Sequence, residues 1–187
     1  LCASNIIYQY WKGDLKPGVL ASTKLMKQYA ESIGAEHRFD HNIEIASKTV
    51  SIPIAGDRNI NLYYEPANPL VDSSFDEYDN VALIDIDVFP VDGLKENLFD
   101  AHKGKDAGIC TEPMQPHFRE IYNVVGITSA NDKHWTRLLK NTWDIDYSYD
   151  DKGRPMVYNT GVMIFSKAGL KKAKETWPSF QEYVDKV

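Results

Sequence analysis

The pattern of apolar and polar residues predicts a strand and a helix early in the chain. Asn5–Trp11 (NIIYQYW) is rich in β-branched and aromatic residues, as strands are. From Gly18 to Ile33 the apolar residues recur near helical spacing, Pro17 suits the first position of a helix, and Gly34 ends the element. A strand, a loop and a helix are therefore expected in this order.

Later segments continue the alternation of strands and helices. Val81–Ile84 (VALI) is apolar on both faces, which is typical of a central strand covered by helices. Asp106–Thr111 is predicted to be another buried strand, and Tyr158–Phe165 (YNTGVMIF) a further one. The remaining expected elements are a short strand at Val50–Ile54, a short helix or turn at Asn61–Val71, and helices at Gly93–His102, Trp135–Trp143 and Lys167–Val187, the last interrupted at Pro178. The alternation indicates an α/β/α sandwich with a mixed, mostly parallel central sheet.

Composition fits a single folded domain. The chain has 187 residues, of which 43% are hydrophobic and 26% charged, values ordinary for a globular protein. A formal net charge of −6 argues against binding of nucleic acid, which needs clustered Lys and Arg. No segment approaches the ~18 apolar residues of a membrane span.

Cysteine usage says little about the compartment. Cys2 and Cys110 make no disulfide framework and no metal-ligand spacing, so a reducing compartment such as the cytoplasm is favoured. Because the sequence begins at Leu1 and not at Met, we expect it to be part of a longer protein.

The sharpest chemical signal is the acidic pair Asp85 and Asp87, which directly follows the apolar run. In an extended segment, residues i and i+2 point to the same side, so both carboxylates would meet where α/β sheets place their ligands. Two adjacent carboxylates repel each other unless a cation or a proton lies between them. Mg²⁺ or Mn²⁺ suits such a site and bridges carboxylates to a diphosphate.

The alternative is that these Asp residues only begin a turn. Asp-x-Asp triplets arise by chance, and Asp144-Ile145-Asp146 is a second one in this chain. No apolar run leads into that second triplet, so it is interpreted as loop.

Three segments in the same order resemble retaining glycosyltransferases of the A-type fold, especially the glycogenin and bacterial lipopolysaccharide galactosyltransferase family. Asn80–Asp100 is similar to the family's apolar strand, Asp-x-Asp triplet and following helix. Tyr158–Ile164 resembles its Phe-Asn-(Ser/Ala)-Gly-Val motif, and Asp106–Glu112 its intervening strand, which ends in an acidic residue near the donor sugar. The resemblance covers roughly residues 80–112 and 156–175, with a weaker similarity at 5–30, and implies a Rossmann-like nucleotide-binding fold.

The resemblance also implies roles for the matched residues. Asp85 and Asp87 would chelate Mn²⁺ or Mg²⁺, which would bind the diphosphate of a nucleotide-sugar donor, expected to be a UDP-hexose. Main-chain groups around Ile86 would face the ribose. Glu112 and Asn159 would hydrogen-bond the hydroxyls of the transferred sugar.

Three more residues are expected at the nucleotide. Gly161 would let the backbone approach the ligand, since glycine has no Cβ. Tyr10 and Trp11 end the first predicted strand, where such enzymes hold the base, and an aromatic face stacks well on uracil. The competing interpretation is that both aromatic residues pack in the core.

The resemblance divides the expected single glycosyltransferase domain, 1–187, into three parts. Residues 1–112 would form the nucleotide-sugar half, and 156–187 the C-terminal strand and helix. Between them, 113–155 would be an insertion on the side of the saccharide acceptor, because its aromatic residues suit sugar rings.

Two departures from the family pattern stand out. Tyr63–Pro66 lacks the basic residue that the family commonly has before Asp-x-Asp, and Arg58 is the nearest substitute. All five His residues precede Asn159, so none near the C-terminus supplies a third metal ligand.

The expected reaction is transfer of a hexose to an acceptor hydroxyl, with retention on the strength of the resemblance. An inverting enzyme would need a carboxylate base, for which Asp146, Asp150 and Asp151 are candidates.

Three alternatives stay open. A phosphatase of the haloacid dehalogenase type also has an apolar strand before Asp-x-Asp, but continues with Gly-Thr where Val88-Phe89-Pro90 stands here. A nucleotidyltransferase would need a richer phosphate loop than Lys12-Gly13-Asp14. The third alternative is a non-catalytic domain that binds sugar nucleotides.

Overall fold

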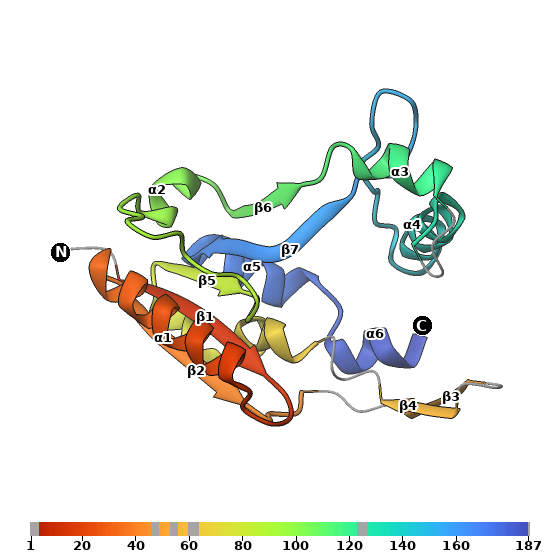
Figure 1. Ribbon diagram of the computed structural model, residues 1–187. Coiled ribbons are helices and arrows are strands. Elements are labelled where there is room, and N and C mark those ends of the chain that lie inside the picture. The colour runs from red at the N-terminus through yellow and green to blue at the C-terminus, as the bar shows by residue number, and fades with distance from the viewer. Residues whose placement is uncertain (1–3, 46–48, 53–55, 60–63, 123–126, 187) are drawn as a thin grey trace. The chain divides into compact units, whose positions relative to one another are not determined.

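The computed structural model describes residues 4–45, 49–52, 56–59, 64–122 and 127–186 (Figure 1). The chain groups into two compact units, one formed by residues up to Gly108 and from Thr160 onward, the other by Ile109–Asn159. The expected insertion at 113–155 falls inside the second unit.

The first unit carries the sheet. Its strands are β1 (Asn5–Trp11), β2 (Glu36–His41), β3 (Thr49–Ile52), β4 (Gly56–Asn59) and β5 (Asn80–Ile84). Its helices are α1 (Pro17–Ser32), the 3₁₀ helices η2 (Glu65–Leu70) and η3 (Ser73–Glu77), α2 (Leu98–His102), α5 (Lys167–Thr176) and α6 (Phe180–Lys186). Strands β6 (Ala107–Thr111) and β7 (Tyr158–Ser166) each contribute residues to both units, and the second unit contains α3 (Gln115–Ile121) and α4 (Ser129–Trp143).

The five-stranded sheet has the order β2-β1-β5-β7-β6, and β3 and β4 form a separate antiparallel pair. β1 is parallel to both β2 and β5, whereas β7 is antiparallel to β5. The predicted α/β class with a mixed sheet is therefore confirmed. Because β1 and β5 are parallel neighbours, the segments that follow their carboxyl ends emerge at the same edge of the sheet.

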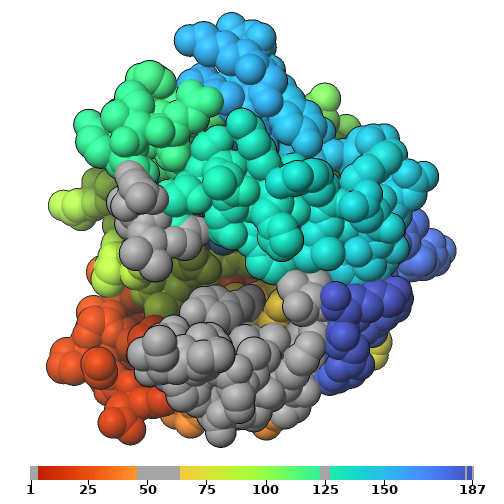
Figure 2. All heavy atoms as spheres, turned by 90° about the vertical axis from the view of Figure 1, so that its right-hand side faces the viewer, coloured from red at the N-terminus to blue at the C-terminus, as the bar shows by residue number. Residues whose placement is uncertain are grey.

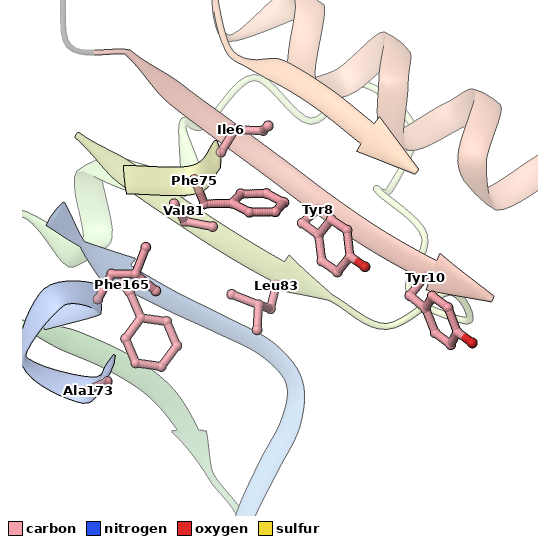
Figure 3. Close-up of a cluster of buried hydrophobic side chains, with 9 residues drawn as sticks. Ile6, Tyr8, Tyr10, Phe75, Val81, Leu83, Phe165 and Ala173 are labelled. Atoms are coloured by element: carbon pink, nitrogen blue, oxygen red, sulfur yellow. The ribbon is translucent and has the colours of Figure 1, made fainter. Parts of the chain in front are cut away.

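Two clusters of buried side chains lie on opposite faces of the sheet, because successive residues of β1 point to opposite sides. The first cluster, which Figure 3 draws with all members but Leu170 labelled, comprises Ile6, Tyr8, Tyr10, Phe75, Val81, Leu83, Phe165, Leu170 and Ala173. The second comprises Ile7, Met26, Tyr29, Ala30, Ala82, Ile84, Phe99 and Ile164. Helix α5 and the 3₁₀ helix η3 thus cover one face and α1 the other, and packing on both faces positions the ends of β1 and β5.

The best-predicted elements are those with the strongest apolar patterns. β1 has the predicted bounds, α1 begins at Pro17, and β5 and β7 each differ from prediction by a single terminal residue. The predicted interruption at Pro178 is confirmed, since α5 ends at Thr176 and α6 begins at Phe180.

Other elements correct the predictions. β2 and α3 were not expected; β2 (EHRFDH) lies at an edge of the sheet and is mostly polar, so it has no apolar run. Helix α2 begins only at Leu98, because the Asn97 side chain caps it by accepting a hydrogen bond from Phe99 N. β6 is largely exposed and not buried, because it is the other edge strand.

Three further predicted elements overlap helices or strands of the structure. α4 extends back to Ser129, where Thr128 caps it. The expected strand Val50–Ile54 corresponds to β3, with Pro53 and Ile54 outside the described residues, and η2 lies within the expected Asn61–Val71 segment. None of the described helices combines the length and the apolar character needed to cross a membrane.

A buried histidine in the first unit leads us to expect a pH-dependent stability. His102 is only 4% exposed, and neither of its ring nitrogens has a hydrogen-bond partner among the described residues. Burial lowers the pKa of His102, although Asp106 opposes the shift. Burial also lowers the pKa of His37, and Lys27 adds to that effect.

We therefore expect the protein to lose stability on acidification. A histidine whose pKa is lowered in the folded state takes up its proton more readily when unfolded, so stability falls as the pH drops below about 6.5. The melting temperature should be lower at about pH 5.5 than at about pH 7.5, and this difference should shrink in His102→Leu. Equal pH dependence in the two proteins would show that His102 does not contribute.

Candidate functional site

A pocket of about 680 Å³ lies where the carboxyl ends of β1 and β5 emerge, within the first unit. This volume is in the range of about 300–1,000 Å³ that small-molecule sites occupy. The described residues that line it come from β1 and its end, η2, β5 with the following turn, and β7: Tyr10, Trp11, Lys12, Pro66, Ala67, Leu83, Ile84, Asp85, Ile86, Asp87, Thr160 and Met163. Figure 3 shows Tyr10 and Leu83 near the ends of their strands.

The acidic pair lies in a turn and not in an extended segment, which corrects the prediction from sequence. β5 ends at Ile84, and Val88 N donates a hydrogen bond to Asp85 O at 3.1 Å. The pairing of β5 with β1 stops at Leu83, and its paired register with β7 stops at Ile84. The strand register thus ends before Asp85, and the chain turns there. Asp85 and Asp87 nevertheless line the same pocket, as expected.

The electrostatics of this turn favour a cation. Asp85 is half-buried and Asp87 is exposed. Burial, and then the charge of Asp87, raises the pKa of Asp85 above its usual value. A divalent cation between the two carboxylates would offset both effects.

Two protein carboxylates leave most of a cation's coordination sphere open. Among the described residues, no group of three His, Cys, Asp or Glu side chains is placed to hold a metal. Mg²⁺ is often bound by one or two carboxylates together with water and substrate phosphates, and the pair fits that type of site.

The two aromatic candidates differ in their surroundings. Tyr10 is 6% exposed, belongs to the first core cluster and donates its hydroxyl to Ile43 O at 3.2 Å. Burial, with a contribution from the charge of Glu65, raises the pKa of Tyr10 to about 12. Trp11 is half-buried and its indole N–H donates to Asp14 O at 2.9 Å, so its ring is oriented and part of it stays open. Trp11 is thus better placed than Tyr10 for stacking on a ligand.

Lys12 is a pocket residue that the sequence reasoning missed. Its Nζ lies 3.2 Å from Oε1 of Glu65, a carboxylate with no exposed surface. Lys12 is the one cationic side chain among the described lining residues. Lys12 directly follows the predicted strand Asn5–Trp11, and this position in the sequence could have indicated that it lies at the pocket. Arg58, the expected substitute, lies in β4, whose side chains are outside the described part of the chain.

Ile86 and Gly161 surround the acidic turn. Ile86 lines the pocket, and its expected role beside the ribose stays a prediction. Gly161 is buried, and its carbonyl accepts a hydrogen bond from Asp85 N at 2.9 Å. The described lining residues from β7 are Thr160 and Met163, so Gly161 contributes to the site through the backbone of Asp85.

The two sugar-binding candidates form a pair in the second unit. Asn159 Nδ2 donates to Glu112 Oε1 at 2.6 Å, and Glu112 N donates to Val157 O at 2.8 Å. The structure thus brings Glu112 and Asn159 together, although 46 residues separate them in the sequence.

The second Asp-x-Asp triplet has a structural role in the second unit. Asp144 adopts the left-handed conformation (φ 55°) that ends α4. Lys140 Nζ binds Asp144 at 2.7 Å and Asp146 at 2.8 Å. The interpretation of this triplet as loop is confirmed. The preceding helix α4 is the teal region of Figure 2.

A further acidic candidate in this unit, Asp150, is also engaged in side-chain and backbone contacts. Asp150 forms an ion pair with Arg154 at 2.7 Å and accepts hydrogen bonds from the backbone N–H groups of Lys152 and Arg154. It therefore stabilises a turn, which weakens its candidacy as a catalytic base.

Comparisons of the chain with protein-family models, with curated proteins and with solved structures gave no match. A functional assignment therefore depends on the chemistry of the pocket and on the motif resemblance.

Proposed function

We propose that this chain is the nucleotide-sugar-binding part of a metal-dependent glycosyltransferase of the A-type fold, which transfers a hexose from a UDP-sugar to an acceptor hydroxyl. One observation carries the proposal: Asp85, Asp87 and the half-open ring of Trp11 line one pocket where two parallel strands end. Ligands of open α/β sheets bind outside the carboxyl ends of the strands.

Each part of the pocket suits a different part of the donor. Asp85 and Asp87 would hold Mn²⁺ or Mg²⁺, which supplies Lewis-acid stabilisation of the departing diphosphate when bound. Lys12 is anchored by Glu65 through one N–H, so two further donors of its ammonium group can face phosphate oxygens. The ring of Trp11 offers a stacking surface for the base.

The motif resemblance assigns recognition of the transferred sugar to Glu112 and Asn159, and that of the acceptor to the segment 113–155. Glu112 and Asn159 present an acceptor and a donor for sugar hydroxyls, and orientation of this kind lowers the barrier to transfer. Tyr149 is 49% exposed and offers an aromatic face for a saccharide ring. Retention of configuration follows from the motif resemblance.

Calorimetry of UDP binding with and without Mn²⁺ tests this proposal. We expect UDP to bind at least about tenfold more tightly with saturating Mn²⁺, because the cation bridges the carboxylates and the diphosphate. Free sugar should then appear when UDP-hexose is supplied with Mn²⁺.

Other outcomes would favour the alternatives. Hydrolysis of a simple phosphate ester without UDP binding would indicate a phosphatase and overturn the proposal. Mn²⁺-dependent UDP binding without sugar release or transfer would indicate a non-catalytic sugar-nucleotide-binding domain. Failure to bind UDP at any Mn²⁺ concentration would rule out both the transferase and the binding domain.

A further inference from the structure

A network of buried polar side chains lies beneath the acidic turn on the face of the sheet covered by α1. Gln9 of β1 and Ser22 of α1 both have no exposed surface. Gln9 Nε2 donates to Ser22 Oγ at 3.3 Å and to Asp85 O at 3.4 Å, and Ser22 Oγ donates to Val88 O at 3.2 Å. The network therefore reaches the backbone at both ends of the Asp85–Val88 turn.

His37 fixes the orientation of the Gln9 amide. His37 Nε2 lies 3.1 Å from Gln9 Oε1. The opposite orientation would place the amide oxygen of Gln9 against the carbonyl oxygen of Asp85, and neither can donate a hydrogen bond. The buried amide thus has partners for both its oxygen and its nitrogen.

Packing alone does not explain these two residues. The nearest β1 residues on the same face as Gln9 are Ile7 and Trp11, which are largely apolar. A buried amide among them costs free energy unless it is hydrogen-bonded. The partners of Gln9 and Ser22 include the backbone of the turn that carries both carboxylates. Asp85 N also donates a hydrogen bond to Gly161 O, and Asp85 O accepts one from Val88 N. With the bond from Gln9, three hydrogen bonds hold the main chain of Asp85.

We infer that Gln9 and Ser22 are positioning residues that hold the Asp85–Val88 turn in the geometry required by a small divalent cation. This inference rests on the proposed function. Groups that orient metal ligands from behind affect metal affinity by roughly 10–100-fold when they are removed. Mg²⁺ demands near-ideal octahedral geometry at about 2.0–2.1 Å, whereas Ca²⁺ tolerates irregular geometry at about 2.3–2.6 Å. Loosening the turn should therefore weaken the binding of Mg²⁺ more than the binding of Ca²⁺.

The experiment measures UDP affinity in saturating Mg²⁺ and in saturating Ca²⁺ for the wild type, Gln9→Met and Ser22→Ala. Gln9→Met keeps the side-chain length and removes the donor. Gln28→Met, on the exposed side of α1, is the matched control. In the two network variants we expect UDP affinity to fall by about 10–100-fold with Mg²⁺ and by less than about threefold with Ca²⁺. Gln28→Met should change neither.

The possible outcomes distinguish failure of the inference from failure of the proposed function. Equal losses with both ions, or unchanged affinity with Mg²⁺ in folded variants, would overturn the inference while the proposed function stands. Should Gln9→Met fail to fold, Ser22→Ala decides, because it removes the bond to Val88 O with little change in volume. If the wild-type protein fails to bind UDP in the presence of either ion, both the inference and the proposed function are overturned.

Discussion

Replacement of Asp87 by Asn is expected to abolish metal-dependent UDP binding while leaving the fold intact. Asp87 is exposed and makes no contribution to the buried clusters, so the substitution removes charge without disturbing the core. Loss of one of two anionic ligands should weaken UDP binding in Mn²⁺ on the order of 100-fold or more. Calorimetry measures the affinity, and circular dichroism with thermal denaturation checks the fold.

The chain provides its own control for this substitution. Asp146→Asn makes the same chemical change in the second Asp-x-Asp triplet, where the carboxylate is exposed and binds Lys140. A surface ion pair of this kind contributes little, about 0–1 kcal/mol, so Asp146→Asn should leave both stability and UDP affinity nearly unchanged. Unchanged affinity in Asp87→Asn, or an equal loss in both variants, would contradict the assignment of the metal site.

Substitution of Gly169 by Ala is expected to destabilise the first unit strongly. A Cβ at this position of α5 would overlap the carbonyl oxygen of Asp106 and would lie 2.5 Å from its carbonyl carbon. The Asp106 backbone cannot easily withdraw, because Ser166 N donates to its carbonyl oxygen at 3.0 Å. Overpacking of this kind costs about 1–3 kcal/mol or more, which corresponds to a fall in melting temperature of roughly 2–12 °C or more.

Gly18→Ala is the matched control, with the opposite expected sign. Gly18 lies in α1, and a Cβ there would meet no heavy atom within 4 Å. Replacing a helical glycine by alanine stabilises by about 0.5–1 kcal/mol, so the melting temperature should rise by a few degrees. A rise or no change in Gly169→Ala would show that α5 can shift away from Asp106.

The close approach at Gly169 was not predictable from the sequence. Nothing near Gly169 in the sequence distinguishes it from Gly18, since both stand within the first few residues of a predicted helix. The difference arises from Asp106, which is 63 residues away and is brought against α5 only when β6 and β7 join the sheet.

What the sequence by itself determined is the set of elements with strong apolar patterns and the location of the acidic pair. Helix α1 follows from a repeat of apolar residues, because burial of one helix face demands a fixed spacing. β1 and β5 follow from largely apolar runs, because both of their faces are buried. Asp85 and Asp87 follow directly after an apolar strand, so their place at the end of the sheet was readable from one short stretch.

Only the tertiary structure decided how that end of the sheet is built. The ion pair of Lys12 with Glu65 joins residues 53 positions apart, and the hydrogen bond of Gln9 with Asp85 joins residues 76 positions apart. The turn at Asp85 depends on where the pairing of β5 with its neighbours stops. The core position of Tyr10 and the more open one of Trp11 likewise depend on which face each presents to the packed helices. Local periodicity reports which residues prefer burial, but contacts between distant segments are set by the packing of the whole unit, and these contacts shape the pocket.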